Sequence, residues 1–227
     1  EGELVGLIGP NGAGKTTIFN LLTGVYQPTE GNFYLHGKSM LGKKPHQMVE
    51  EGIARTFQNI RLFKDLSVLD NVKVAFNQSM GYSMMEGIFR LPRYWREERE
   101  IEKKAYDILS VFHMEGEVGQ KAKNLPYGRQ RKLEIARAIA TGAKILLLDE
   151  PAAGMNPTET AELMETITLI RTRFGVSILL IEHDMSLVMS ICERIVVVDY
   201  GQIIAAGSPY EVANDPKVIR AYLGQDE

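Results

Sequence analysis

The stretch Leu4-Val-Gly-Leu-Ile-Gly-Pro-Asn-Gly-Ala-Gly-Lys-Thr16 decides the fold of this 227-residue chain. Its apolar run Leu4–Ile8 predicts a buried strand, and a helical pattern over Lys15–Thr23 follows. Between them, Gly9 to Thr16 matches the pattern G-x-x-x-x-G-K-[ST], which in a strand–loop–helix setting is typical of a phosphate-binding loop. A glycine-rich turn carrying a solvated lysine is the alternative, and the agreement of motif and setting argues against it.

Each part of this loop has a chemical task. Glycines let the backbone wrap a polyphosphate with successive N–H groups pointing inward, and the positive end of the helix adds to the attraction. We expect Lys15 to reach the β- and γ-phosphates of a nucleotide and Thr16 to offer its hydroxyl to Mg²⁺. The predicted nucleotide-binding residues are Gly9, Pro10, Asn11, Gly12, Ala13, Gly14, Lys15, Thr16 and Thr17.

The composition narrows the class of protein. The 26 Lys and Arg residues are outnumbered by 29 Asp and Glu, which gives a net charge near −3 and argues against a nucleic-acid partner. The single cysteine, Cys192, cannot form an intramolecular disulfide and favours a reducing compartment. No apolar run approaches the ~20 residues that span a bilayer. We therefore expect a soluble, intracellular protein.

Short apolar runs alternate with helical patterns along the rest of the chain, which predicts an α/β fold with a parallel sheet. The expected buried strands are Ile145–Leu148, Val176–Ile181 and Ile195–Val198, with weaker strands at Asn32–His36 and Gln202–Ala205. The expected helices are Arg129–Ala140, Thr158–Arg173 and Met185–Cys192.

The middle of the chain differs, because no convincing parallel strand occurs from about Val68 to Thr141. Arg96–Phe112 instead has apolar residues at helical spacing. We expect a single nucleotide-binding domain over 1–227, with an α/β core at 1–67 and 142–227 and a helical subdomain inserted at 68–141. Within that subdomain, Phe76–Trp95 is rich in apolar residues, which form either its core or a surface for a membrane partner. They are Met80, Tyr82, Met84, Met85, Ile88, Phe89, Leu91, Tyr94 and Trp95.

Two acids, Asp149 and Glu150, end the predicted strand Ile145–Leu148. A carboxylate at the tip of a neighbouring strand is what a phosphate-loop site needs to hold Mg²⁺ through water, and we assign that task to Asp149. Glu150 is positioned to act as a general base on an attacking water. Acids that only cap the turn at Pro151 are the alternative.

Together with three further motifs, the sequence resembles the ATP-binding subunit of an ABC transporter. The motifs follow the family's order over nearly the whole chain: the phosphate loop, Arg55-Thr-Phe-Gln58, Leu125-Pro-Tyr-Gly-Arg-Gln-Arg131, Leu148-Asp-Glu-Pro151 and Ile181-Glu-His-Asp184. Arg55–Phe63, Asp149–Pro157 and the ending Val218–Gly224 resemble most closely the ATPase of branched-chain amino-acid importers. The resemblance implies a P-loop NTPase fold with a RecA-like parallel sheet core, a helical subdomain insertion and a partial antiparallel β subdomain.

The resemblance also implies roles for single residues. Gln58 would contact Mg²⁺ and the attacking water, and His183 would contact the γ-phosphate and orient that water. The alternatives are an ordinary polar residue at a strand end and a structural histidine. Asn156 occupies a position where most members of the family have Asp.

The segment Leu125–Arg131 departs most from the family, whose usual form is Leu-Ser-Gly-Gly-Gln. In the family this signature loop heads a helix and closes over ATP bound to a second subunit. The resemblance implies that Gly128 supplies N–H groups and that Arg129 adds positive charge near the nucleotide. A helix start with a solvated basic face is the alternative.

The implied function is an ATPase that powers an ABC transporter, with ATP and Mg²⁺ as cofactors. Its implied partners are polytopic permease subunits, a second ATPase copy or a paralogue and, indirectly, a solute-binding protein, at the cytoplasmic face of the membrane. A non-transport or regulatory ATP-binding protein is the alternative. Only eight residues precede Gly9, so we expect an N-terminally truncated cassette that lacks the family's adenine-stacking aromatic residue.

Overall fold

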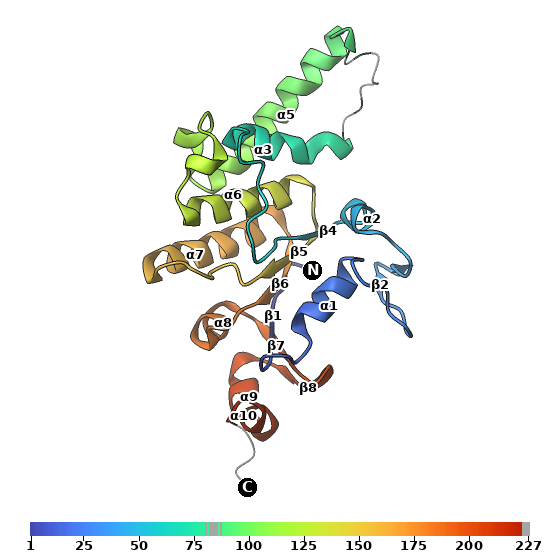
Figure 1. Cartoon of the computed structure of the whole chain (residues 1–227), viewed down its shortest axis with the longest axis vertical. Helices are drawn as coiled ribbons and strands as arrows, with labels where there is room; N and C mark the ends of the chain where they lie inside the picture. Colours follow the sequence, from blue (N-terminus) through green and yellow to red (C-terminus); the bar gives the residue numbers. More distant parts are fainter. Residues whose placement is uncertain (80, 82–85, 87, 224–227) are drawn as a thin grey trace. The chain divides into compact units, whose positions relative to one another are not determined.

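The phosphate-loop strand lies inside a six-stranded sheet of a computed structural model that describes residues 1–79, 81, 86 and 88–223. The strand order is β4-β5-β6-β1-β7-β8, and only β8 runs antiparallel to its neighbour (Figure 1). The bounds are β1 Leu4–Ile8, β4 Ile53–Arg55, β5 Ile145–Asp149, β6 Ser177–Ile181, β7 Arg194–Asp199 and β8 Gln202–Gly207. The predicted α/β class with a mostly parallel sheet is confirmed.

The central strands are buried on both faces, which is why their sequences are continuous apolar runs rather than alternating ones. In β5, Leu146, Leu147 and Leu148 are all buried. A hydrophobic cluster packs on one side of the sheet around the fully buried Phe19 of α1 (Lys15–Leu22). The other members of this cluster are Leu7, Met40, Met48, Ile53, Leu147, Ile181 and Val198.

In the strand order β4-β5-β6-β1-β7-β8, the connection from β1 to β4 runs toward the β4 edge of the sheet. The connection from β6 to β7 runs in the opposite direction, toward the β8 edge. Right-handed crossovers in opposite directions put their helices, α1 and α8 (Met185–Ile191), on opposite faces of the sheet. Figure 1 shows these two helices on either side of β1. In such a sheet, ligands bind in the crevice beyond the carboxyl ends of the strands where the winding reverses, and here that point is the end of β1.

Two strands lie apart from this sheet as a hairpin of β2 (Tyr34–Leu35) and β3 (Lys38–Ser39). The turn residues His36 and Gly37 both have positive φ, which suits a tight two-residue turn. The weak strand expected at Asn32–His36 therefore exists but is shorter. The weak strand expected at Gln202–Ala205 is β8, which pairs with β7.

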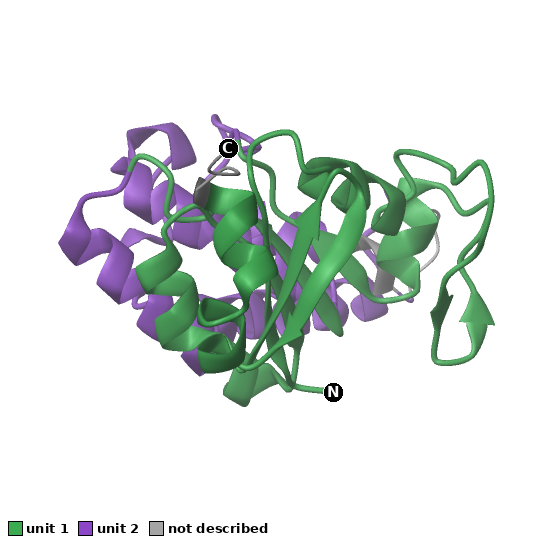
Figure 2. Cartoon of the chain, turned by 90° about the horizontal axis from the view of Figure 1, so that it is seen from below, with its two compact units in different colours: residues 1–58, 144–154, 170–227 green, residues 59–143, 155–169 purple. Residues whose placement is uncertain are grey.

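The chain forms two compact units, coloured separately in Figure 2. Unit 1 comprises residues 1–58, 144–154 and 170–227, and unit 2 comprises residues 59–143 and 155–169. Unit 1 holds the sheet and, at its C-terminal end, α9 (Pro209–Ala213) and α10 (Pro216–Leu223). It also contains α2 (Pro45–Glu50), which packs beside β4. The predicted subdomain 68–141 falls within unit 2.

Unit 2 is helical, and no strand lies in its described residues from Val68 to Thr141. Its helices α3 (Val68–Lys73), α5 (Pro92–Val111) and α6 (Tyr127–Ala140) pack on one another. Short 3₁₀ turns η1 (Val74–Ser79), η2 (Glu115–Glu117) and η3 (Ala122–Asn124) connect them. Helix α7 (Pro157–Phe174) begins in this unit and ends in unit 1. The helices expected from periodicity are confirmed to within a few residues.

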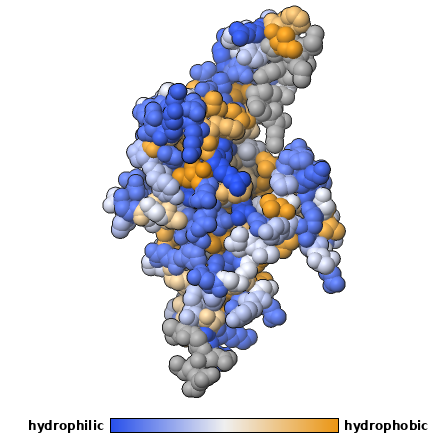
Figure 3. Space-filling view, in the orientation of Figure 1, coloured by the Kyte–Doolittle hydropathy of each residue, from blue (hydrophilic) through white to orange (hydrophobic). Residues whose placement is uncertain are grey.

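The apolar segment Phe76–Trp95 is partly exposed: four of its described apolar residues are exposed, and Phe76 and Tyr94 are half-buried. The side chains of Ile88, Phe89, Leu91 and Trp95 are 45–66% exposed, so these four do not form a core. Figure 3 shows a group of hydrophobic atoms at the N-terminal end of α5, where these residues lie. Met80, Tyr82, Met84 and Met85 lie outside the described residues.

Cys192 follows α8 and is buried. Burial raises the pKa of its thiol to about 12, so the thiol stays protonated and unreactive at neutral pH. Within the described residues, no helix has the length and apolar character needed to cross a membrane.

Candidate functional site

The loop between β1 and α1 has a backbone that only glycines adopt easily. Gly9, Gly12 and Gly14 have φ values of 156°, 81° and 105°. At Gly9 a Cβ atom would lie 2.0 Å from the carbonyl oxygen of Val198, so no other residue fits without moving the backbone. The loop leads into α1, whose first turn carries no acidic residue. The positive end of α1 is therefore available to an anion.

Lys15 stretches back across this loop. Its Nζ donates hydrogen bonds to the carbonyl oxygens of Gly9 at 2.6 Å and Pro10 at 3.0 Å, and the side chain is buried. Burial lowers the pKa of Lys15 below its ordinary value, and the nearby charge of Glu150 partly opposes this shift. The ammonium group is thus held at the inside of the loop, where a phosphate would neutralise it.

A cavity of about 270 Å³ opens on the inner side of the loop in unit 1. Loop residues and the start of α1 form one wall, and the residues that follow β5 and β6 form the other. The lining residues are Asn11, Gly12, Ala13, Gly14, Lys15, Thr16, Thr17, Glu150, Ile181 and His183. The structure thus brings the predicted phosphate loop, the predicted general base and the predicted histidine to one cavity.

Glu150 contacts two other predicted site residues, His183 and Gln58. Its Oε1 lies 2.8 Å from Nε2 of His183, and its Oε2 accepts a hydrogen bond of 3.0 Å from Nε2 of Gln58. The Glu150 side chain is 19% exposed and its backbone has φ of 48°. That left-handed conformation is unfavourable for a residue with a side chain.

Asp149, the predicted Mg²⁺ ligand, is buried at the end of β5 and forms an ion pair with Arg55. Nη2 of Arg55 lies 2.6 Å from Oδ2 of Asp149, and Nη1 donates a 2.7 Å hydrogen bond to Oδ1 of Asn20 in α1. The guanidinium also lies 5.3 Å from the ring centroids of both Phe19 and Phe57. Arg55 therefore joins the end of β5 to the phosphate-loop helix.

The signature segment begins α6 in unit 2. Gly128 is buried against the side chain of Glu159, which would lie 3.0 Å from a Cβ added at that glycine. Arg129 lies beside it but is engaged within its own unit. Its guanidinium forms a 3.0 Å ion pair with Glu117 and donates a 2.6 Å hydrogen bond to the carbonyl of His113. The phosphate contact expected of Arg129 remains a prediction.

Asn156 has a structural task that the sequence did not reveal. Its Oδ1 accepts a 2.9 Å hydrogen bond from the backbone N–H of Glu159, and a carboxylate oxygen of Glu159 accepts one of 3.1 Å from the N–H of Asn156. This reciprocal pair caps the start of α7, where Asn is among the preferred residues.

Two residues of the site were missed by the sequence analysis. Arg55 occurs inside the Arg55–Gln58 motif, but the strand that places it beside Asp149 has only three residues, too few to show a period in the sequence. Glu182 stands between Ile181 and His183, and its carboxylate is buried. An acid directly after an apolar strand is a signal of the kind that identified Asp149 and Glu150.

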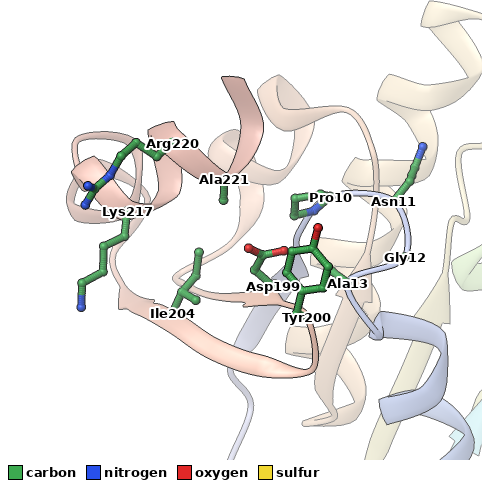
Figure 4. Close-up of a pocket in the computed structure, with 10 residues that line it drawn as sticks. All are labelled: Pro10, Asn11, Gly12, Ala13, Asp199, Tyr200, Ile204, Lys217, Arg220 and Ala221. Carbon is green, nitrogen blue, oxygen red and sulfur yellow. The ribbon is translucent and has the colours of Figure 1, made fainter. Parts of the chain in front are cut away.

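A second cavity, of about 660 Å³, lies on the outer side of the phosphate loop within unit 1 (Figure 4). Asp199 and Tyr200 at the end of β7 and Lys217 and Arg220 of α10 line it. It shares Asn11, Gly12 and Ala13 with the first cavity, so the loop has open space on both sides.

The residues present fit a Mg²⁺ ion that is bound together with a nucleotide. Among the described residues, no three His, Cys, Asp or Glu side chains converge on one point. Mg²⁺ usually keeps several waters and uses one or two carboxylates plus substrate phosphates. The hard oxygen donors Thr16, Asp149 and Gln58 agree with that mode of binding, and phosphate oxygens would supply the rest.

Comparison with known proteins gives consistent matches. The family profile described as "ABC transporter" matches residues 1–153, and the profile described as "Branched-chain amino acid ATP-binding cassette transporter" matches residues 202–227. The high-affinity branched-chain amino acid transport ATP-binding protein BraF of Pseudomonas aeruginosa is 46% identical over 225 residues, covering 99% of this chain and 88% of BraF. LivG of Escherichia coli, described in the same words, is 47% identical over 223 residues, covering 98% and 88%.

Solved structures agree with these matches. The ADP conformation of MJ1267, an ATP-binding cassette of an ABC transporter, superimposes with a TM-score of 0.82 at 32% identity, over 99% of this chain and 89% of that one. The cassette cbiO1 of Clostridium perfringens, part of the complex cbiONQ, has a TM-score of 0.79 at 27% identity, over 96% and 82%.

Proposed function

Since this chain belongs to the ABC transporter family, among the ATP-binding proteins of the branched-chain amino acid transport group, we propose that it powers the import of branched-chain amino acids. It is an ATPase subunit that binds and hydrolyses ATP to drive transport. The observation that carries the site assignment is the contact of Glu150 with both His183 and Gln58 beside the phosphate-loop cavity.

In this proposal the phosphate loop and Lys15 hold the β- and γ-phosphates of ATP. The bonds from Lys15 to the carbonyls of Gly9 and Pro10 support it, because a phosphate would replace carbonyls as the partner of the ammonium group. Thr16 and Thr17 begin α1 at the same cavity wall and offer hydroxyl groups to the nucleotide or its metal. Binding is then dominated by backbone N–H groups and one lysine.

Glu150 acts as the general base. A water between its carboxylate and the γ-phosphate gives up a proton to Glu150 as its oxygen attacks phosphorus, and ADP leaves with the bridging oxygen. General-base catalysis contributes about 10²–10⁴ in rate. The bonds from His183 and Gln58 hold the carboxylate in one orientation, and the same two side chains are placed to orient the water. Mg²⁺, when bound with ATP, would neutralise developing charge on the phosphate oxygens and would be held by Thr16, Gln58 and, through water, Asp149.

The signature segment completes the site in a pair of subunits. We propose that Gly128 and Arg129 of one subunit face the ATP held by the other, because each chain carries both half-sites and a head-to-tail pair then closes with two ATP molecules. The pair consists of two copies of this chain or of this chain and a paralogue. The N-cap residue of α6, Pro126, makes no side-chain capping bond, which supports a backbone contact to phosphate.

The proposed partners are polytopic permease subunits, with a solute-binding protein acting through them. The exposed apolar side chains at the N-terminal end of α5 support a protein contact in unit 2. In this arrangement the chain lies at the cytoplasmic face of the cell membrane and reaches the membrane only through the permease.

The test is co-purification of the tagged chain with the permease proteins encoded beside it, followed by reconstitution in proteoliposomes. We expect ATP hydrolysis that rises when the solute-binding protein and leucine, isoleucine or valine are added together. Hydrolysis that no solute stimulates, with no permease recovered, would favour a non-transport or regulatory ATP-binding protein instead.

A further inference from the structure

Glu182 is a buried acid that the proposed chemistry does not use. Its side chain lies directly after β6, and the residue is only 6% exposed. Burial raises the pKa of its carboxyl, and the neighbouring charge of Glu150 adds to the shift. Burying a carboxylate is costly unless its oxygens receive hydrogen bonds. The hydrogen-bond partners of these two oxygens therefore indicate the role of Glu182.

Both oxygens bind backbone of the catalytic loops. Oε1 accepts a 2.8 Å hydrogen bond from the N–H of Ala152, in the loop that follows Glu150. Oε2 accepts one of 3.3 Å from the N–H of His183. A single side chain thus joins the segment that carries the general base to the segment that carries the histidine bonded to it.

The backbone at Glu150 needs such a support. A residue with a side chain at φ of 48° is strained and persists only where its surroundings fix it. Three hydrogen bonds do so: Glu150 N–H to the carbonyl of Ile181 at 2.9 Å, Ala153 N–H to the carbonyl of Glu150 at 3.1 Å, and Ala152 N–H to Glu182. Of the three, only the last is made by a side chain, so it is the one that a substitution can remove.

We propose that Glu182 is a positioning residue for ATP hydrolysis, which holds Glu150 and His183 in their mutual orientation without touching the substrate. This inference rests on the proposed function of Glu150 as the general base. Removing the carboxylate frees the N–H of Ala152 and lets the Glu150 backbone relax toward an ordinary conformation. The carboxylate then leaves the position from which it takes the proton, while the phosphate loop keeps its nucleotide contacts.

The experiment compares Glu182→Leu and Glu182→Gln with the parent in the reconstituted transporter. Misplacement of a reacting group by ~1 Å can cost about 10²-fold in rate, so we expect kcat of Glu182→Leu to fall by about 10- to 100-fold. Glu182→Gln keeps one carbonyl acceptor for Ala152 and loses the bond from His183, so its kcat should fall several-fold. The affinity for ATP should change by less than about twofold in both, because the phosphate loop is untouched.

Glu211→Gln is the matched control. Glu211 also accepts a backbone hydrogen bond, of 2.7 Å from the N–H of Ser208, but it caps α9 and lines neither cavity. Its kcat should equal that of the parent. Amide hydrogen exchange of the peptide spanning 150–154 is the second readout and should be faster in both Glu182 variants but not in the control.

An unchanged kcat in Glu182→Gln overturns the proposal, and so does a parallel loss of kcat and ATP affinity. Should Glu182→Leu fail to fold, Glu182→Gln and the exchange measurement decide alone. The proposed function is tested separately by the parent and by Glu150→Gln. If the parent itself does not hydrolyse ATP, the proposed function is wrong. If the parent hydrolyses ATP and Glu182→Gln has the same kcat, only the inference about Glu182 is wrong.

Discussion

Arg55 donates a hydrogen bond of 2.6 Å to Asp149 inside unit 1, where the two side chains are only 8% and 9% exposed. The ends of β4 and β5 are adjacent because these strands pair in parallel, with Arg55 opposite Leu147. The acid expected to serve the metal is thus already neutralised by a cation from the neighbouring strand. The same guanidinium reaches Asn20 of α1, so the pair also ties the sheet to the phosphate-loop helix.

Arg55→Met should destabilise the protein by about 3–5 kcal/mol, because removing one member of a buried ion pair leaves an uncompensated charge. Arg194→Met is the matched control. Arg194 pairs with Glu3 at 2.7 Å, but the side chains are 51% and 37% exposed, so its loss should cost less than about 1 kcal/mol. Urea unfolding without nucleotide measures both. Equal losses in the two variants would mean that the Arg55 pair contributes no more than a surface pair.

Glu150→Gln should lower ATP turnover by about 10²–10⁴, because the amide cannot accept the proton of the attacking water. ATP binding should persist, since the phosphate loop is unchanged, and the ATP-bound protein should accumulate as a dimer. Turnover is measured by phosphate release, affinity by titration calorimetry and the dimer by size-exclusion chromatography in ATP. If ATP affinity disappears together with turnover, the assignment of Glu150 as the base is wrong.

Gly9→Ala should abolish nucleotide binding. Its Cβ would lie 2.0 Å from the backbone oxygen of Val198, so the loop must shift, and the left-handed φ adds strain. Gly116→Ala is the control, because a Cβ there meets nothing within 4 Å and the stability should change by no more than about 0.5 kcal/mol. Titration with fluorescent ADP measures the first effect and thermal unfolding the second. Normal ADP binding by Gly9→Ala would show that the loop tolerates displacement.

Much of the core was predictable from sequence because its strands are long, apolar and buried on both faces. β1 and β5 are confirmed over nearly the predicted residues. The helix α1 also follows the phosphate loop, as the loop motif predicts. Strand β4 was missed because its three residues Ile53–Arg55 are too short to show a period. The contacts of Arg129 and Asn156 could not be predicted either, since they depend on partners such as Glu117 that tertiary packing alone brings close.

Arg129→Gln restores the residue usual in the family and separates two roles of this side chain. In the structure, the guanidinium binds Glu117 and the carbonyl of His113, so the variant should lose about 1–3 kcal/mol of stability. Because Arg129 is also proposed to face the ATP held by the other subunit, ATP turnover at a temperature where both proteins are folded should fall by more than about threefold. Turnover that stays within about threefold would show that the role of Arg129 is confined to its contacts with Glu117 and His113.

Glu182 should impose a pH dependence on stability that Glu182→Gln removes. Burial raises the pKa of this carboxyl above its ordinary value of 4.5. The native protein therefore keeps a proton there at pH values where the unfolded chain has lost it, and stability falls as the pH rises from 4.5 through the raised pKa. The free energy of unfolding of Glu182→Gln, taken relative to the parent, should increase over that interval and level off above it. The gain in stability would accompany the loss of turnover proposed above.

Glu211→Gln tests the sign of this pH dependence, because hydrogen bonds from the backbone and hydroxyl of Ser208 lower the pKa of Glu211. A lowered pKa contributes stability above pH 4.5 that is lost as the pH falls through the native pKa, so this variant should lose stability relative to the parent as the pH rises. Urea unfolding from pH 4 to pH 8 should therefore give difference curves of opposite slope for the two variants. Parallel curves would show that Glu182 is not the buried, proton-retaining acid that its surroundings indicate.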